Sequence, residues 1–125
     1  GKFRSIAVTK DMGKNWSESS ISHNTLNDPV CMGNMIKALV NENGLVRNVL
    51  FFSNCNNQKV RADITIKASL DSGETWPESD QLLIDQRKCY GYSSITKIDK
   101  NTLGILYEGR KSLYFVKIPV NNIIK

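Results

Sequence analysis

The sequence has few of the residues that mark metal centres or disulfide frameworks. It contains one histidine, His23, and its three cysteines, Cys31, Cys55 and Cys89, include no Cys-x-x-Cys pair. A structural zinc site needs closely spaced thiolates or imidazoles, and an odd number of cysteines cannot form a closed set of disulfides within one chain. The sequence therefore predicts no metal site, and we interpret the cysteines as free or half-buried thiols.

Long hydrophobic runs are also missing. The longest extend over only a few residues, such as Val49-Leu50-Phe51-Phe52, whereas a helix needs roughly 20 apolar residues to cross a bilayer. No membrane span is therefore predicted. The apolar stretch of a secretory signal does not open the chain either, and its start at Gly1 rather than Met is consistent with a processed or truncated product.

Neither sign of charge is concentrated along the chain. The 125 residues include 17 Lys and Arg against 12 Asp and Glu, for a net charge of +5, without a run of five basic residues. A nucleic-acid-binding protein is expected to gather its cations in a patch or a recognisable module, so we expect no nucleic-acid partner. The modest excess of cations predicts a mild attraction for anionic substrates.

The sequence does contain a series of short β-rich segments broken by Gly, Asn, Asp and Pro. Hydrophobic residues make up 40% and charged residues 23% of the chain, an ordinary globular composition that excludes intrinsic disorder. No long stretch has the 3.6-residue apolar period of a capped helix. The pattern predicts nine strands, over residues 3–9, 17–22, 33–40, 46–53, 62–69, 81–85, 93–99, 102–108 and 112–118.

Two eight-residue segments, Thr9–Trp16 and Ser69–Trp76, share the skeleton Ser/Thr-x-Asp-x-Gly-x-x-Trp. Each lies between two predicted strands, and its residue types suit a tight turn. The aspartate accepts hydrogen bonds from backbone N–H groups, the glycine adopts positive φ, and the tryptophan folds back over the turn. The skeleton resembles the Asp-box, or bacterial neuraminidase repeat. The second copy matches the full pattern, and the first is degenerate at Thr9 and Asn15.

A repeat of about 60 residues with four strands is the blade of a β-propeller. We therefore expect an all-β fold that forms part of a six-bladed β-propeller, with about two and a quarter blades of four-stranded antiparallel sheet. Two strands would belong to a first blade, four to a second and three to a third. The cut sides should expose sheet edges and apolar surface. In an antiparallel blade, the two Asp-boxes lie on one face, and Arg61, Tyr92 and Glu108 lie on the opposite face.

At these positions the chain resembles the exo-α-sialidase (bacterial neuraminidase) family. Gly91-Tyr92-Ser93 is similar to the segment that carries the family's tyrosine nucleophile, and residues 104–108 resemble the Leu-Tyr-Glu segment that follows it. Arg61 matches the third arginine of the triad that binds the substrate carboxylate. Residues 29–34 resemble a Cys-Gln-Gly-Ser stretch, in which Met32 replaces the glutamine. The resemblance covers residues 1–125 as the C-terminal fragment of a single sialidase propeller domain.

The resemblance implies a retaining hydrolase that removes terminal sialic acid from sialylated glycans without a cofactor. Tyr92 and Glu108 are the expected catalytic residues, Tyr92 as the nucleophile and Glu108 as a carboxylate that orients an arginine, while Arg61 binds substrate. A neutral phenol suits this substrate because its own carboxylate would repel a carboxylate nucleophile. The family's acid/base aspartate, base glutamate and other two arginines lie upstream, so this chain alone should be inactive without the N-terminal part of the propeller. The family also implies a periplasmic or secreted location.

Three alternatives stay open. Tyr90 is the rival nucleophile, although Tyr92 follows the glycine as the motif requires. A non-catalytic Asp-box propeller that binds glycans or a protein is the second function that fits the repeats, and it need not keep Arg61 or Glu108. A sialidase that transfers sialic acid to another glycan instead of to water is the third.

Overall fold

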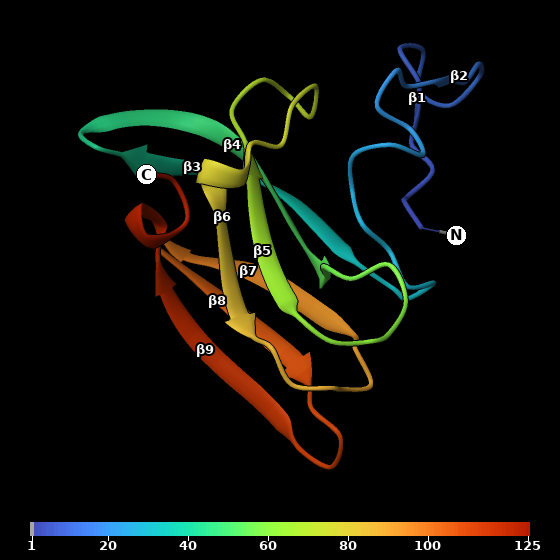
Figure 1. Cartoon of the computed structure of the whole chain (residues 1–125). Helices are drawn as coiled ribbons and strands as arrows, with labels where there is room; N and C mark the ends of the chain where they lie inside the picture. The colour runs from blue at the N-terminus through green and yellow to red at the C-terminus, as the bar shows by residue number, and fades with distance from the viewer. Residues whose placement is uncertain (1) are drawn as a thin grey trace.

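The computed structural model describes residues 2–125 and arranges nine strands in three antiparallel sheets (Figure 1). In each sheet, the strands pair in the order in which they follow along the chain. No helix in the described part is longer than the three-residue 3-10 turns Glu78–Asp80 and Val120–Asn122, and none is long and apolar enough to cross a membrane. The predicted all-β fold is therefore confirmed. The strands are β1 (Ala7–Val8), β2 (Ser17–Glu18), β3 (Asn34–Glu42), β4 (Leu45–Cys55), β5 (Ile64–Ser69), β6 (Gln81–Asp85), β7 (Ser93–Asp99), β8 (Thr102–Glu108) and β9 (Leu113–Pro119).

The sheets reproduce the predicted division into two, four and three strands. β1 pairs with β2, β3 to β6 form a four-stranded sheet, and β7 to β9 form a three-stranded sheet. An Asn-Gly turn closes the first hairpin of the four-stranded sheet, where Asn43 has φ 50° and Gly44 has φ 91°. The side chain of Asn41 accepts a hydrogen bond of 2.9 Å from the Gly44 N–H. This turn type matches the right-handed twist of the flanking strands.

The first two strands are shorter than predicted. Ladder pairing in β1 and β2 covers two residues each instead of residues 3–9 and 17–22, because the chain turns immediately after β2. The Ser22 N–H donates to the Ser19 carbonyl, and the Ser22 hydroxyl accepts from the Ile6 N–H. β5 also begins two residues late, because Asp63 has φ 59°, which lies outside the strand region.

The main core lies between the four-stranded and the three-stranded sheet. Alternating side chains of β4, β5 and β8 meet there and are almost fully buried, among them Val49, Phe51, Ile64, Ile66, Leu103 and Ile105. Two polar contacts also cross between the sheets: the hydroxyls of Ser53 and Ser93 lie 2.8 Å apart, and the Asn34 side chain accepts the Ile95 N–H at 2.7 Å. The start of β7 is therefore attached to the neighbouring sheet by packing and by hydrogen bonds.

The two turn motifs, Thr9–Trp16 and Ser69–Trp76, have the same internal hydrogen bonds. In the second, the Ser69 hydroxyl accepts the Gly73 N–H at 2.9 Å, Asp71 accepts the Thr75 N–H at 2.9 Å, and the Trp76 indole donates to the Gly73 carbonyl at 3.2 Å. The first has corresponding bonds of 2.8, 2.9 and 3.1 Å. Both turns place a residue and then a glycine at positive φ. The repeat identified in the sequence is therefore also a structural repeat.

One face of the three-stranded sheet is apolar and exposed. Ile98, Leu106, Leu113 and Phe115 are between 42% and 67% exposed on β7, β8 and β9. Their neighbours along the strands, such as Ile105 and Ile118, are buried in the core on the other face of the sheet. Both faces of this sheet are therefore suited to burial, and only one of them is covered within residues 2–125.

Candidate functional site

The loops that carry the predicted site residues gather at one end of the strands. Figure 1 shows the end of β6, the start of β5 and the β8–β9 turn at the lower end of the sheets, with the two turn motifs at the upper end. Arg61 precedes β5, Tyr92 precedes β7, and Glu108 is the last residue of β8. The antiparallel arrangement therefore brings these three residues, which are far apart in the sequence, to the end opposite the turn motifs.

Tyr92 stands next to a backbone position that only glycine fits. Gly91 has φ +99°, and a Cβ atom added to it would lie 2.8 Å from the sulfur of Cys31 and 2.8 Å from the sulfur of Cys55. Gly91 is buried, and the tyrosine that follows it is 46% exposed. The sharp bend at Gly91 therefore presents the Tyr92 side chain at the surface before β7 begins.

Glu108 is bonded to the backbone of Tyr92. The Tyr92 N–H donates to Glu108 Oε2 at 3.2 Å, and the Glu108 N–H donates to the Tyr92 carbonyl at 2.9 Å. Together with the pairing of Ser93 with Tyr107 where β7 begins, these two hydrogen bonds fix the backbone of Tyr92. The second Glu108 oxygen accepts no hydrogen bond from residues 2–125.

Arg61 lies over the ring of Tyr92. The guanidinium carbon is 5.9 Å from the ring centroid, a distance suited to a cation–π contact. Two backbone carbonyls hold the guanidinium in place, since Arg61 donates to Tyr90 at 3.0 Å and to Val30 at 3.3 Å. Arg61 is exposed, and arginine has five N–H donors. Donors are therefore left for an incoming carboxylate.

Tyr90, the rival of Tyr92, is also exposed, at 60%. Its backbone serves the site, since its carbonyl accepts from Arg61 and its N–H donates to the Gly109 carbonyl at 3.2 Å. The Arg61 guanidinium thus contacts the ring of Tyr92 but the backbone of Tyr90. The geometry therefore favours Tyr92 as the partner of Arg61.

The three cysteines converge beneath this loop, which their sequence spacing does not indicate. Cys55 Sγ lies 3.9 Å from Cys89 Sγ and 3.8 Å from the Gly91 carbonyl, and Cys31 Sγ lies 3.8 Å from the Tyr90 carbonyl. All three are free cysteines. Burial raises the pKa of the Cys55 and Cys89 thiols, so they stay protonated and pack as small apolar groups. The three cysteines pack beneath the bend at Gly91 and form the floor of the site.

A small hollow beside Tyr92 completes the site. It has a volume of about 200 Å³, and Met32, Tyr92, Leu106 and Glu108 contribute to its walls. Met32 is 47% exposed. The residue that departs from the family pattern is therefore a neighbour of Tyr92. Among residues 2–125, no group of His, Cys, Asp and Glu side chains is arranged to hold a metal ion.

Taken together, the site offers a guanidinium with free donors, an exposed phenol beside it and a carboxylate that fixes the phenol's backbone. It is carried by a four-stranded and a three-stranded antiparallel sheet packed on each other, which define part of a β-propeller. No family model matches the chain.

Known proteins with similar sequence and fold identify the class. A sialidase of Bacteroides fragilis (strain YCH46) is 43% identical over an alignment of 126 positions, which covers 100% of this chain and 23% of the relative. A sialidase of Micromonospora viridifaciens is 35% identical over 108 residues, or 85% of this chain and 16% of the relative. The solved structure of the Hadza microbial sialidase Hz136 matches 99% of this chain and 24% of its own, with a TM-score of 0.88 and 40% identity. The chain therefore belongs to the sialidase family, and it spans less than a quarter of the length of these relatives.

Proposed function

We propose that this chain is the C-terminal part of the catalytic propeller of an exo-α-sialidase, a retaining hydrolase that removes terminal sialic acid from glycoconjugates. The observation that carries the proposal is the position of the Arg61 guanidinium, 5.9 Å from the ring of the exposed Tyr92, whose N–H is held by Glu108. The relatives named sialidase support the reaction class. In this proposal, the two turn motifs are Asp-boxes with a structural role.

Arg61 binds the carboxylate that sialic acid carries on its anomeric carbon. The planar guanidinium pairs with a carboxylate through two parallel hydrogen bonds, and the carbonyls of Tyr90 and Val30 hold it in place before substrate arrives. Because the substrate carboxylate is attached to the reacting carbon, this contact brings that carbon next to Tyr92.

Tyr92 is the nucleophile. The phenol gives its proton to a base and its oxygen forms a bond to the anomeric carbon, while the glycosidic bond breaks and the leaving oxygen takes a proton from an acid. Water then gives a proton to the conjugate base of that acid and attacks the same carbon, the phenol oxygen leaves and takes its proton back from the base, and two inversions give retention. A phenol with a pKa near 10 needs a base, and the base and the acid come from residues upstream of this chain. Glu108 positions Tyr92 through its backbone, and its second oxygen is available to orient an upstream arginine.

In this proposal, the remaining part of the propeller is a partner of this chain. The exposed apolar face of β7, β8 and β9, with Leu106 and Phe115, is the side where a further blade would pack. Of the expected catalytic and carboxylate-binding residues, this chain supplies Arg61, Tyr92 and Glu108. The acid, the base and the other two arginines of the triad would come from the remaining part of the propeller, so this chain alone should be inactive. A periplasmic or secreted location, where sialylated glycans are encountered, belongs to the same proposal.

Two substitutions in the full-length protein test this mechanism. Tyr92→Phe should abolish turnover of an aryl sialoside while sialic acid still binds, because it removes the nucleophilic oxygen without emptying the site. Arg61→Lys should instead lower kcat/KM and weaken sialic-acid binding, by about 2–3 kcal/mol if one charged hydrogen bond is lost.

Tyr90→Phe is the matched control, since it removes a phenol oxygen from the same loop and should leave turnover largely intact. If Tyr90→Phe abolishes turnover and Tyr92→Phe does not, the nucleophile is Tyr90. If the wild-type full-length protein binds sialylated glycans and cleaves none of them, it is a non-catalytic Asp-box propeller. Transfer of sialic acid to an added galactoside in place of water would show a trans-sialidase.

A further inference from the structure

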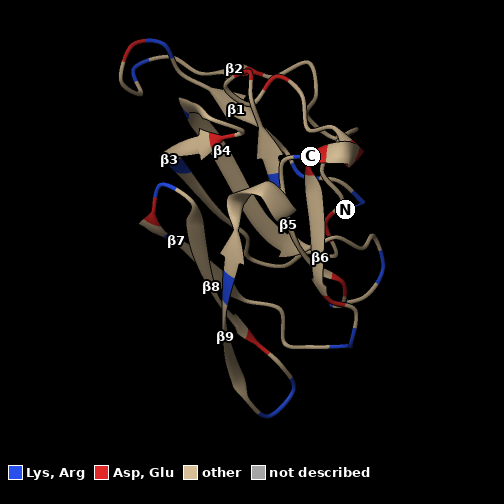
Figure 2. Ribbon diagram, turned by 90° about the vertical axis from the view of Figure 1, so that its left-hand side faces the viewer, with Lys and Arg blue, Asp and Glu red and all other residues tan. Residues whose placement is uncertain are grey.

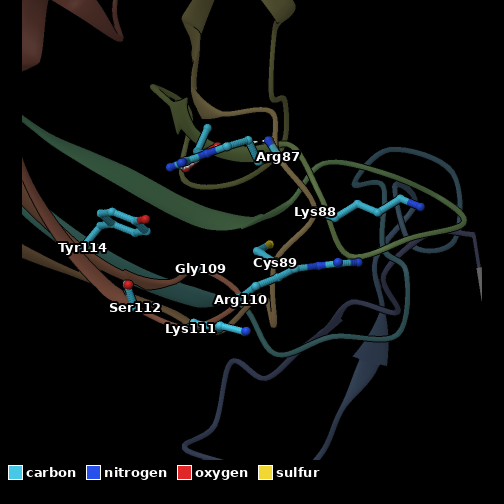
Figure 3. Close-up of a pocket in the computed structure, with 9 residues that line it drawn as sticks. Arg87, Lys88, Cys89, Gly109, Arg110, Lys111, Ser112 and Tyr114 are labelled. Carbon is cyan, nitrogen blue, oxygen red and sulfur yellow. Dashed lines mark hydrogen bonds and ion pairs between the residues drawn. The ribbon is translucent and has the colours of Figure 1, made fainter.

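A basic pocket lies beside the candidate site, at the same end of the strands. It has a volume of about 640 Å³ and is formed by the segment that follows β6 and by the turn between β8 and β9. Figure 2 shows cationic residues in both of these segments. Its charged walls are Arg87 and Lys88 on one side and Arg110 and Lys111 on the other, with Asp85 as the only carboxylate among its lining residues (Figure 3).

Arg87 is already paired with a carboxylate and packs on an aromatic ring. Arg87 donates to both oxygens of Asp85, with bonds of 2.9 Å and 2.6 Å, and its guanidinium carbon lies 5.2 Å from the ring centroid of Tyr114. Asp85 also accepts from the Tyr107 hydroxyl at 3.0 Å, and the rings of Tyr107 and Tyr114 are stacked. The Arg87 hydrogen bonds lower the pKa of Asp85, so this carboxylate stays ionised and compensates Arg87.

The other three cations are not compensated. Lys88, Arg110 and Lys111 are exposed, and their side chains take part in no ion pair within the described part of the chain. In Figure 3, Lys88 and Arg110 extend to the same side of Cys89. Three like charges around one concave surface repel one another, and an anion that enters the pocket relieves this repulsion.

The basic pocket is connected to the candidate site. A second hollow of about 320 Å³ shares Arg110 and Lys111 with it and is lined on its other side by Tyr90 and Glu108. The segment that contains Tyr90 and the β8–β9 turn are joined here, since the Tyr90 N–H donates to the Gly109 carbonyl at 3.2 Å. A glycan chain that leaves the Tyr92 site in this direction therefore passes directly over the three free cations.

We propose that the basic pocket binds an anionic group on the part of the glycan that leaves, either the carboxylate of a second sialic acid or a sulfate ester. This inference rests on the proposed sialidase function and adds a preference among its substrates. Carboxylate and sulfate present the same chemistry to the pocket, a compact anion with several acceptor oxygens, and guanidinium and ammonium groups are suited to both.

The experiment compares sialosides that differ only in the leaving part. The full-length wild type and the variant Arg110→Ala/Lys111→Ala are assayed on sialyllactose, on a disialylated lactose and on sialyllactosamine with a sulfate on its N-acetylglucosamine. The double variant should lose about tenfold in kcat/KM on the anionic substrates, which corresponds to about 1.4 kcal/mol, and keep the wild-type value on sialyllactose. The wild-type preference should also fall with salt, because the pocket is open to solvent.

Lys14→Ala/Lys100→Ala is the matched control, since it removes the same charge from exposed positions at the opposite end of the strands. A loss on the disialylated substrate alone identifies a carboxylate site, and a loss on the sulfated substrate alone a sulfate site. A loss on both supports recognition of charge itself. Equal kcat/KM changes on all three substrates, or an equal effect of the control variant, would overturn the proposal.

A direct binding measurement separates this proposal from the sialidase assignment. Sulfated N-acetyllactosamine contains no sialic acid, so its binding does not depend on Arg61 or Tyr92. If the wild type cleaves no sialoside, the sialidase assignment fails. Titration with sulfated N-acetyllactosamine then still tests whether the basic pocket binds an anionic group. Binding that is lost in Arg110→Ala/Lys111→Ala supports the pocket, whereas no binding, or equal binding in both proteins, rejects it.

Discussion

Replacement of Gly91 by alanine tests whether the bend before Tyr92 depends on the sulfurs beneath it. The new Cβ atom would lie 2.8 Å from Cys31 Sγ and 2.8 Å from Cys55 Sγ, and it would stand on a backbone with φ +99°. A side chain in a left-handed conformation costs about 1–2 kcal/mol, and overpacking a filled core typically costs a further 1–3 kcal/mol. We therefore expect Gly91→Ala to destabilise the protein by about 2–5 kcal/mol.

The clash and the backbone strain can be separated by a double-mutant cycle. Cys31→Ala removes one of the two sulfurs that the new methyl group meets, so Gly91→Ala/Cys31→Ala should be less destabilised than the sum of the two single variants. The rescue should be partial, because the second sulfur and the positive φ remain. Denaturant unfolding of the full-length protein measures the free energies, and kcat/KM on an aryl sialoside reports whether Tyr92 has moved.

Two results would refute this reasoning. If Gly91→Ala unfolds at the same denaturant concentration as the wild type, the loop is soft enough to move away from both sulfurs. If the effects of Gly91→Ala and Cys31→Ala simply add, the Cys31 sulfur does not contribute to the destabilisation. In either case, Cys31 would not be part of the floor of the site.

Two further predictions concern groups with shifted pKa values. Burial lowers the pKa of Lys67 to about 8. As the pH rises, the folded protein therefore loses this proton before the unfolded chain does. The free energy of unfolding should rise between pH 8 and about 10.4, by about 3 kcal/mol in all. Lys67→Met should abolish that rise in thermal unfolding measurements, and an unchanged rise in the variant would contradict the assignment. Hydrogen bonds from the Thr75 side chain and backbone lower the pKa of Asp71 to about 2, so its contribution is present above about pH 4 and is lost as the pH falls toward 2. Asp71→Asn should therefore be less stable than the wild type at neutral pH, and this difference should disappear in acid; a difference that persists at pH 2 would contradict it.

Local sequence determined the turns, because their hydrogen bonds close within a few residues, and it determined several strands. The bonds of the second turn motif run among residues 69–76, and the Asn-Gly turn closes within residues 41–44. Predicted and observed bounds agree for β6, β7 and β8, because each has an apolar alternation that is ended by turn residues. Where tertiary contacts set the bounds, the prediction failed, as at Asp63 and at Ser22.

The predicted strands and the antiparallel rule place Arg61, Tyr92 and Glu108 on one face, and the resemblance to a family assigns their roles. Nothing in the spacing of Arg61 and Tyr92, however, indicates that their side chains meet. They meet because β5 and β7 start at the same end of two sheets that pack on each other. The cysteine floor under Gly91 and the basic pocket each combine segments at least 20 residues apart in the sequence. Such contacts depend on how the two sheets pack and on the path of the segment that crosses between them. The strands, the turn motifs and the face on which the site residues lie therefore follow from the sequence, whereas the contacts between their side chains follow only from the packing of the two sheets.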